Sequence, residues 1–186
     1  MTEHNPDFET ELSKHDRWNR RLLNVIMAYF GTPANYLDVG SGTGAMVLSA
    51  RAMGIEAWGI DLMAGFSDYI YHHDLREPFD HGRKYQLVSC IETAEHLEPE
   101  FAPVLVESIS RHTIPGSILI FSAAGPGQDG IDHKNCVLGS VWRDMFYKHG
   151  LSYRHDYTVV MQCAINLLVP APSLDWWLGN LQVFDK

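Results

Sequence analysis

The sequence predicts an α/β fold, a doubly wound and mainly parallel sheet of seven strands with helices on both faces. Short apolar runs alternate with segments of helical periodicity along the chain, as in sheets whose parallel strands are joined by crossover helices. A glycine-rich stretch directly follows the first apolar run, where a strand is expected to turn into a helix. The composition, with 46% hydrophobic and 20% charged residues, is that of an ordinary globular protein.

The chain length bounds the domain organisation. A chain of 186 residues can close a substantial core but is too short for this fold plus a second full domain, so we expect one domain over the whole chain, residues 1–186. It comprises an N-terminal helical segment, a core, and a tail that is irregular or a final edge element: residues 1–33, 34–169 and 170–186. The N-terminal helix is predicted from about Leu12, with Ser13 as its N-cap, to Phe30.

The pattern of apolar and polar residues places the elements of the core. Strands are expected in short runs of apolar or β-branched residues: Tyr36–Val39, Glu56–Asp61, Asp68–His72, Tyr85–Cys90 and Ser117–Phe121, with two more between Leu151 and Val169. Helices are expected where apolar residues recur at helical spacing: Ala45–Met53, a helix that includes Val104–Ile109, and one that Ser140 caps and Gly150 ends.

Charged residues and glycines gather at the ends of the predicted strands. Ligands of parallel sheets bind beyond the carboxyl ends of the strands, so these segments are expected to meet in one site although they are distant in sequence. They are the glycine loop Asp38–Gly44, Asp61, Asp74, the segment Glu92–His96 and the loop Ala124–Asn135. Among the observations drawn from the residues alone, this convergence is the main evidence for a site.

The glycine loop has the sequence D38-V-G-S-G-T-G44. Gly40 allows the tight turn, Gly42 lets the backbone approach a ligand, and Gly44 lets the next helix pack closely. With the alanine that follows, the loop also matches the dinucleotide pattern G-x-G-x-x-A. Asp61 follows Gly40 by 21 residues, where a ribose-binding acid is expected. At this level NAD and other nucleoside cofactors are both open.

The acid before the glycines and the later strand ends make the chain resemble class I S-adenosylmethionine-dependent methyltransferases, which have a Rossmann-like fold, over nearly its whole length. Their loop is an acid followed by G-x-G-x-G, matched here by Asp38, Gly40, Gly42 and Gly44. The resemblance implies S-adenosylmethionine as cofactor and S-adenosylhomocysteine as product. It also implies that Asp61 holds the ribose hydroxyls and that Asp74 and Leu75 face the adenine. Glu92 is expected to belong to the same cofactor site.

A cluster of acids and a histidine directly follows the fourth predicted strand, in I91-E-T-A-E-H-L97. If this segment is helical, Glu92, Glu95 and His96 share one face and can bind a hard divalent ion. His133, from the later loop, is a fourth candidate ligand. The pattern resembles metal-dependent 2′-O-methyltransferases that act on small RNA ends. It also occurs in class I methyltransferases that use no metal, where it shapes the pocket, so a metal is the alternative and not the first expectation.

The loop after the fifth predicted strand more closely resembles that of small bacterial methyltransferases. Its sequence is F121-S-A-A-G-P-G-Q-D-G-I-D-H-K-N135, with the His and Asn of that loop kept, and the likeness ends after Asn135. The loop is expected to line or close the acceptor pocket, and its glycines permit movement. A hydroxyl or amine acceptor must lose a proton, and His133, or else His96, can accept it near neutral pH. We therefore expect these two histidines to be catalytic.

The leading functional hypothesis is methyl transfer to an oxygen or nitrogen of a small-molecule or sugar-like, glycan-type acceptor. A metal-assisted RNA 2′-O-methyltransferase ranks second, because the formal net charge of −9 disfavours a broad phosphate-binding surface. An NAD-dependent oxidoreductase is allowed by the glycine loop, but no Tyr-x-x-x-Lys or comparable hydride-transfer pair follows. A non-catalytic cofactor-binding module is the remaining alternative.

Cysteine use and the lack of long apolar runs predict a cytoplasmic protein without a membrane partner. The three cysteines form no C-x-x-C pair, which fits a reducing compartment. The first residues, MTEHNPDFETEL, are polar and acidic, unlike a secretory signal, and no apolar run reaches membrane-spanning length. The oligomeric state stays open.

Overall fold

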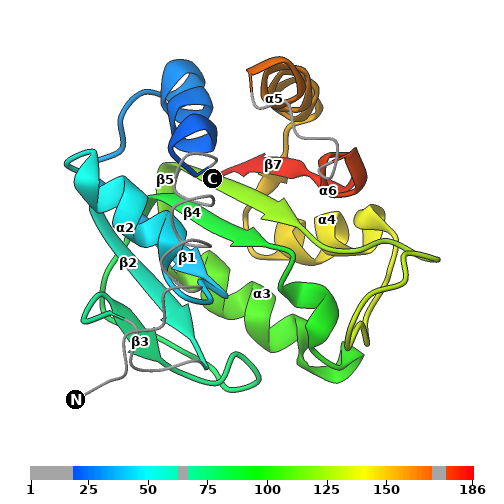
Figure 1. Cartoon of the computed structure of the whole chain (residues 1–186). Helices are drawn as coiled ribbons and strands as arrows, with labels where there is room; N and C mark the ends of the chain where they lie inside the picture. The colour runs from blue at the N-terminus through cyan, green and yellow to red at the C-terminus, as the bar shows by residue number, and fades with distance from the viewer. Residues whose placement is uncertain (1–18, 63–66, 169–174) are drawn as a thin grey trace, which may run out of the picture.

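The computed structural model describes residues 19–62, 67–168 and 175–186 (Figure 1). In this part of the chain the N-terminal helix occupies residues 19–30. It ends at Gly31, as predicted, where a φ of 82° lets the N–H donate back to the carbonyl oxygen of Met27. The predicted start at Leu12 and the N-cap Ser13 lie outside the described residues.

Seven strands form one sheet in the order β3-β2-β1-β4-β5-β7-β6. The strands are β1 (Asn35–Val39), β2 (Glu56–Asp61), β3 (Ile70–His72), β4 (Tyr85–Ile91), β5 (Thr113–Ser122), β6 (Ser152–Tyr153) and β7 (Gln182–Asp185). Each pairing among β1 to β5 is parallel, whereas β7 runs antiparallel to both β5 and β6. The predicted seven-stranded, mainly parallel sheet is confirmed.

Helices cover both faces of the sheet, as predicted (Figure 1). They are α2 (Ala45–Ala52), α3 (Ala102–Arg111), α4 (Gly139–Lys148), α5 (His155–Leu168) and the short α6 (Asp175–Asn180). One face carries α3 and α4, and the other carries the N-terminal helix, α2 and α5. Among the helices in the described ranges, none has the length and apolar character needed to cross a bilayer.

Two apolar cores hold these three layers together. Large buried side chains of α3 and α4 pack on one face of the sheet, among them Leu105, Ile109, Trp142 and Phe146. Those of the N-terminal helix, α2 and α5 pack on the other face, among them Leu22, Ile26, Val47, Met161 and Ile165. Fully burying one such side chain contributes about 1.5–3 kcal/mol, so the sheet is a firm platform for the loops at its edge.

The prediction of two strands between Leu151 and Val169 is wrong, because residues 151–168, the part of this segment that the structure describes, contain the two-residue β6 followed by the helix α5. Its β-branched residues favour a strand by local preference, which explains the wrong prediction. In the structure Thr158, Met161 and Ile165 are buried at helical spacing, whereas Val159 is exposed. Packing on the sheet therefore overrides the local preference.

The tail, residues 170–186, is neither irregular nor an edge element where the structure describes it. It contains α6 and the strand β7, which lies between β5 and β6. Val183 and Phe184 of β7 are fully buried and belong to the cores on opposite faces of the sheet. A smaller correction concerns α4, which begins at Gly139, so Ser140 lies in its first turn and does not cap it.

The strand order opens a crevice at the carboxyl end of β1. β1 pairs with β2 on one side and with β4 on the other. The chain leaves β1 toward α2 and leaves β4 toward α3, which lie on opposite faces of the sheet. Open parallel sheets bind their ligands at such a switch point, and the glycine loop and the segment after β4 meet here.

Candidate functional site

The glycine loop after β1 packs so closely on its neighbours that two of its glycines have no room for a side chain. Gly40 has a φ of 74°, and a Cβ there would lie 2.2 Å from the side chain of Thr93. Gly44, directly before α2, has a φ of 79°, and its Cβ would lie 2.5 Å from Ile70 Cδ1. A Cβ at Gly42 would meet open space. Gly40 and Gly44 thus permit close packing, and Gly42 leaves room beside the loop.

Asp61, the predicted ribose-binding acid, lies at the end of β2 and contacts the loop. Its Oδ2 accepts a hydrogen bond of 2.7 Å from the N–H of Gly42. Both residues line a cavity of about 540 Å³, which we call the cofactor cavity. Its walls also include Gly40, Asp74, Leu75, Glu92, Thr93 and His96. Of the predicted cofactor residues, only Asp38 and Gly44 lie outside these walls.

Asp38 lies beneath the loop, where it joins two strands. It is buried in β1 and accepts a hydrogen bond from Ser89 Oγ of β4. The hydroxyl of Tyr36 lies 2.6 Å from the same Ser89 oxygen. Burial raises the pKa of Asp38 to about 6. Asp38 therefore links β1 to β4 directly before the glycine loop.

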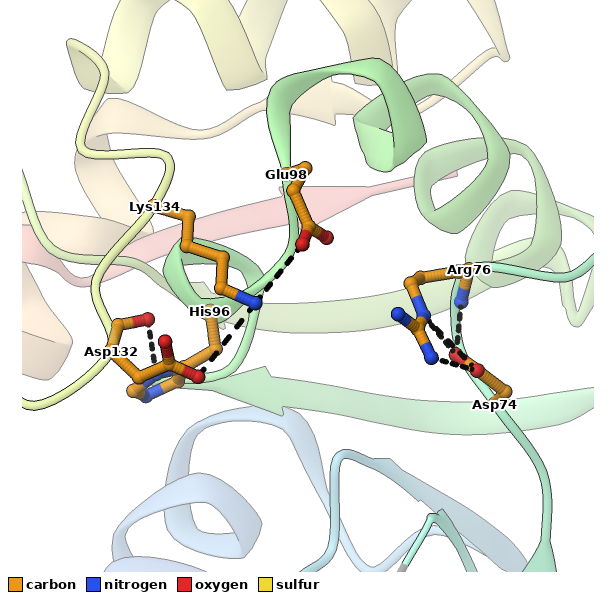
Figure 2. Close-up of polar contacts among 6 residues, drawn as sticks. All are labelled: Asp74, Arg76, His96, Glu98, Asp132 and Lys134. Atoms are coloured by element: carbon orange, nitrogen blue, oxygen red, sulfur yellow. Dashed lines mark hydrogen bonds and ion pairs between the residues drawn. The ribbon is translucent and has the colours of Figure 1, made fainter.

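Asp74 follows β3 and is paired with Arg76, a partner that the sequence reasoning missed. Arg76 Nε donates to the two carboxylate oxygens at 2.9 and 3.0 Å, and Nη2 donates to Oδ2 at 2.6 Å (Figure 2). Hydrogen bonds from Arg76 lower the pKa of Asp74 to about 2. Leu75, between the two, is buried. This wall of the cofactor cavity thus combines a compensated charge pair with an apolar side chain.

A second cavity of about 490 Å³ shares wall residues with the first, and we call it the acceptor cavity. Its walls come from the segment after β4 and the loop after β5: Glu92, Glu95, His96, Ala124, Gln128, Asp129, Gly130 and His133. Glu92 and His96 line both cavities. The fold thus brings together the four residues that the sequence analysis singled out as catalytic or metal-binding candidates.

Glu92 is not helical, which corrects the helical arrangement considered from the sequence. It follows β4 with a φ of 49°, an uncommon value for a residue other than glycine. Its N–H donates to the carbonyl oxygen of Ser122 at 3.0 Å. Only Ala94–His96 form a short 3₁₀ helix, η1. A turn, and not one face of a helix, aims these side chains at the acceptor cavity.

Glu92 and Glu95 form a buried acidic pair. The side chain of Glu95 is fully buried, and among the described residues no lysine or arginine forms an ion pair with either carboxylate. Burial, and then the neighbouring Glu95 carboxyl, raise the pKa of Glu92 to about 7. Burial also raises the pKa of Glu95. Buried carboxylates whose charge is not compensated are costly, so this pair favours a positively charged neighbour.

His96 and His133 are oriented by backbone carbonyl groups of the loop. His96 Nδ1 lies 3.3 Å from the carbonyl oxygen of Asp132, and His133 Nδ1 lies 3.1 Å from that of Gln128. Because a carbonyl oxygen only accepts, we assign the proton to Nδ1 on each ring, which leaves a lone pair on Nε2. The two rings meet edge to face with centroids 5.1 Å apart. Each Nε2 can therefore accept a proton or bind a cation.

The loop after β5 is held against the acceptor cavity by its own backbone. The N–H groups of Lys134 and Asn135 donate to the carbonyl oxygen of Glu95 at 2.7 and 3.0 Å. A Cβ at Gly130 would lie 2.3 Å from the ring of His133. The His133 ring therefore packs on the backbone at a position where only glycine leaves room for it.

Lys134 also ties this loop to the segment after β4 (Figure 2). Its Nζ lies 3.0 Å from Glu98 Oε1 and 3.7 Å from Asp132 Oδ2. These groups are exposed to solvent, which screens their charges, so the ion pairs position the loop more than they stabilise the fold. The sequence reasoning missed Thr93, Arg76, Glu98 and Lys134. Lys134 and Thr93 carried a signal, because they lie in the predicted loop and in the predicted segment Glu92–His96. Arg76 and Glu98 join the cofactor cavity only through folding.

Three of the four candidate metal ligands lie close together. One ligand atom each from Glu95, His96 and His133 lies within 4.8 Å of the others, whereas Glu92 is not part of this group. A carboxylate with two imidazoles suits first-row transition-metal ions. It also suits a positively charged group of an organic ligand, since all three side chains can accept hydrogen bonds.

Comparisons with known proteins extend over most of the chain. The family profile described as Methyltransferase domain matches residues 12–179. The sugar N-methyltransferase KedS8 from a Streptoalloteichus species aligns with a TM-score of 0.69 and 15% identity, over 98% of this chain and 93% of that chain. A SAM-dependent methyltransferase from Archaeoglobus fulgidus aligns with a TM-score of 0.64 and 15% identity, over 98% and 100%.

A third solved structure has a bound ligand. The O-methyltransferase from a trans-AT PKS multienzyme of Brevibacillus brevis, in complex with S-adenosyl-L-homocysteine, aligns with a TM-score of 0.61 and 16% identity. The alignment covers 96% of this chain and 74% of that chain. At these identities the three likenesses establish the shared fold. No curated protein sequence matches significantly.

Proposed function

Because the chain belongs to the methyltransferase domain family, we propose that it transfers the methyl group of S-adenosylmethionine to an oxygen or nitrogen of a small or sugar-like acceptor. The observation that carries this proposal is the pair of cavities that share Glu92 and His96. The fold of this chain is similar to those of a sugar N-methyltransferase and of an O-methyltransferase, which is compatible with nitrogen or oxygen as the methylated atom. Family membership removes the support for an NAD-dependent oxidoreductase.

The walls of the cofactor cavity fit a nucleoside. Its volume of about 540 Å³ is typical of small-ligand sites. The carboxylate of Asp61 can accept hydrogen bonds from ribose hydroxyls, and Leu75 offers an apolar surface to adenine. Open space at Gly42 lets a ligand approach the loop backbone. When bound, S-adenosylmethionine supplies an electrophilic methyl group on a positively charged sulfur.

The residues of the acceptor cavity position the acceptor and remove its proton. Transfer needs the accepting atom in line with the methyl group, so positioning and exclusion of water provide much of the catalysis. Nε2 of His133 takes the proton, since Nδ1 is occupied by its contact with the Gln128 carbonyl oxygen. His96, which lines both cavities, contacts the acceptor beside the cofactor. In this proposal the two histidines are the catalytic residues.

A metal-assisted reaction is the second candidate, and the grouping of Glu95, His96 and His133 favours it. In that case the three side chains would bind a divalent ion that lowers the pKa of an acceptor hydroxyl. RNA is the less favoured acceptor, because the net charge of −9 opposes binding to phosphates. A small-molecule or glycan-like partner and a cytoplasmic location stay predictions.

Calorimetric titration with S-adenosylhomocysteine and with NAD tests the proposed function. We expect S-adenosylhomocysteine to bind and NAD not to bind. Asp61→Ala should weaken S-adenosylhomocysteine at least about tenfold, the effect of losing a charge-assisted hydrogen bond. Asp144→Ala, which removes an exposed carboxylate of α4, should leave it unchanged. Binding of NAD alone, or equal affinities in wild type and Asp61→Ala with intact thermal unfolding, would overturn the proposal.

A further inference from the structure

We propose that the acceptor cavity binds a protonated amine, and that the methylated atom is the nitrogen of this amine. The inference rests on the proposed function and narrows its substrate class. It concerns the residues that face the acceptor, Glu92, Glu95, His96 and His133, and not those that hold the cofactor.

The first argument is the charge of the cavity walls. Glu92, Glu95 and Asp129 contribute carboxyl groups, and no lysine or arginine is among the residues that line this cavity. Glu95 is fully buried, and among the described residues no lysine or arginine forms an ion pair with it. The nearby Lys134 is engaged by Glu98 at 3.0 Å. A cationic ligand would supply the compensation that these buried acids lack.

The second argument is the geometry of the acceptors. The ligand atoms of Glu95, His96 and His133 lie within 4.8 Å of one another. An ammonium group that donates three tetrahedral hydrogen bonds of about 2.9 Å holds its acceptors about 4.7 Å apart. A zinc-sized ion draws its ligands to about 3.4 Å from one another, given metal–nitrogen distances of about 2.1 Å. The spacing that an ammonium group requires, about 4.7 Å, thus falls within the 4.8 Å that bounds the three ligand atoms.

The third argument is how charge moves during the reaction. The ammonium group first passes one proton to Nε2 of His133, and the neutral amine then turns the freed lone pair from His133 toward the methyl group. Its lone pair forms the new N–C bond while the S–C bond breaks and leaves its electrons on sulfur, so the positive charge moves to nitrogen. Carboxylates beside this nitrogen stabilise the developing charge. An oxygen acceptor would approach as a negative alkoxide, which the same carboxylates would repel.

The amine analogue sinefungin provides a test that needs no knowledge of the natural acceptor. It carries an ammonium-bearing carbon where S-adenosylmethionine has its methylated sulfur, so its charge lies where the two cavities meet. Affinities of the full chain for sinefungin and for S-adenosylhomocysteine are measured by calorimetry in EDTA. We expect sinefungin to bind at least about tenfold more tightly, the effect of a charge-assisted hydrogen bond.

Charge-neutral variants identify the groups responsible. Glu95→Gln, at a residue that lines only the acceptor cavity, should reduce the preference for sinefungin while leaving the affinity for S-adenosylhomocysteine within about twofold. Glu92→Gln should also reduce this preference. Glu100→Gln, which removes an exposed carboxylate a few residues further along the chain and outside both cavities, should retain the full preference. Thermal unfolding checks that Glu95→Gln is folded, which we expect because glutamine has the shape of glutamate and removes a buried charge.

The outcomes separate this inference from the proposed function. If the wild type does not bind S-adenosylhomocysteine, both the proposed function and the amine site are contradicted. Intact S-adenosylhomocysteine binding with equal affinity for sinefungin, or a preference that neither glutamine variant changes, overturns the amine site alone. If the wild type shows no preference for sinefungin but binds manganese, and Glu95→Gln does not bind it, the ligand of this cavity is a metal ion and not an amine.

Discussion

Alanine substitutions at Gly40 and Gly42 separate the packing of the glycine loop from its contact with a ligand. Both residues have a positive φ, 74° and 53°, so both substitutions carry the same kind of backbone strain. They differ in space, because a Cβ at Gly40 would lie 2.2 Å from Thr93 Cγ2 and 2.7 Å from its Cβ, whereas a Cβ at Gly42 meets nothing within 4 Å. Gly42→Ala is therefore the matched control.

The expected destabilisation follows from these contacts. A left-handed conformation costs an alanine about 1–2 kcal/mol, partly offset by the reduced entropy of the unfolded chain, about 0.4–1 kcal/mol. Gly42→Ala should thus lower the free energy of unfolding by about 1 kcal/mol. Gly40→Ala must also displace Thr93, including its Cβ, and overpacking of this kind adds about 1–3 kcal/mol. Its total loss should be about 2–4 kcal/mol.

Urea unfolding followed by tryptophan fluorescence measures the unfolding free energies of the two variants. Calorimetry measures their affinity for S-adenosylhomocysteine. Gly42 lines the cofactor cavity, so Gly42→Ala should weaken S-adenosylhomocysteine out of proportion to its small loss of stability. Equal unfolding free energies for the two variants would refute the close approach of the glycine loop to Thr93. Unchanged ligand affinity in Gly42→Ala would refute the place of the cofactor.

Two further predictions concern groups buried beside the site. Because the pKa of Asp38 is raised to about 6, the folded state binds its proton more tightly than the unfolded state. This carboxyl should therefore destabilise the wild type by about 1 kcal/mol more at pH 7 than at pH 5, and Asp38→Asn should lack that part of the pH dependence in urea titrations. Gly130→Ala should displace the His133 ring and abolish most sinefungin preference with little change in Tm, and a full preference would contradict the packing at Gly130.

Most of the fold could be predicted because its signals are local. A buried parallel strand is a short apolar run, and a strand that turns into a helix beside a ligand needs glycines, as the stretch from Asp38 to Gly44 has them. Parallel strands also carry their carboxyl ends to one edge. This rule alone predicted that Asp61, Asp74 and the segment after β4 meet there.

Tertiary contacts decided the remainder, because the relevant energies come from residues distant in sequence. The β-branched segment of α5 became a helix since one helical face of it packs on the sheet, and β7 entered the sheet between β5 and β6 although it comes last in the chain. Whether a carboxylate is compensated depends on its neighbours in space. Asp74 has Arg76, Asp38 has Ser89, and Glu95 has no lysine or arginine paired with it among the described residues.

The sequence by itself therefore determined the fold class, the glycine loop and the edge of the sheet at which the site forms. Only the tertiary structure decided which acids are paired with a cationic side chain. It also decided which acids are buried beside His96 and His133 without such a partner. The physical reason is that strand and helix periodicity are properties of neighbouring residues. Desolvation and charge compensation instead depend on which segments fold against one another.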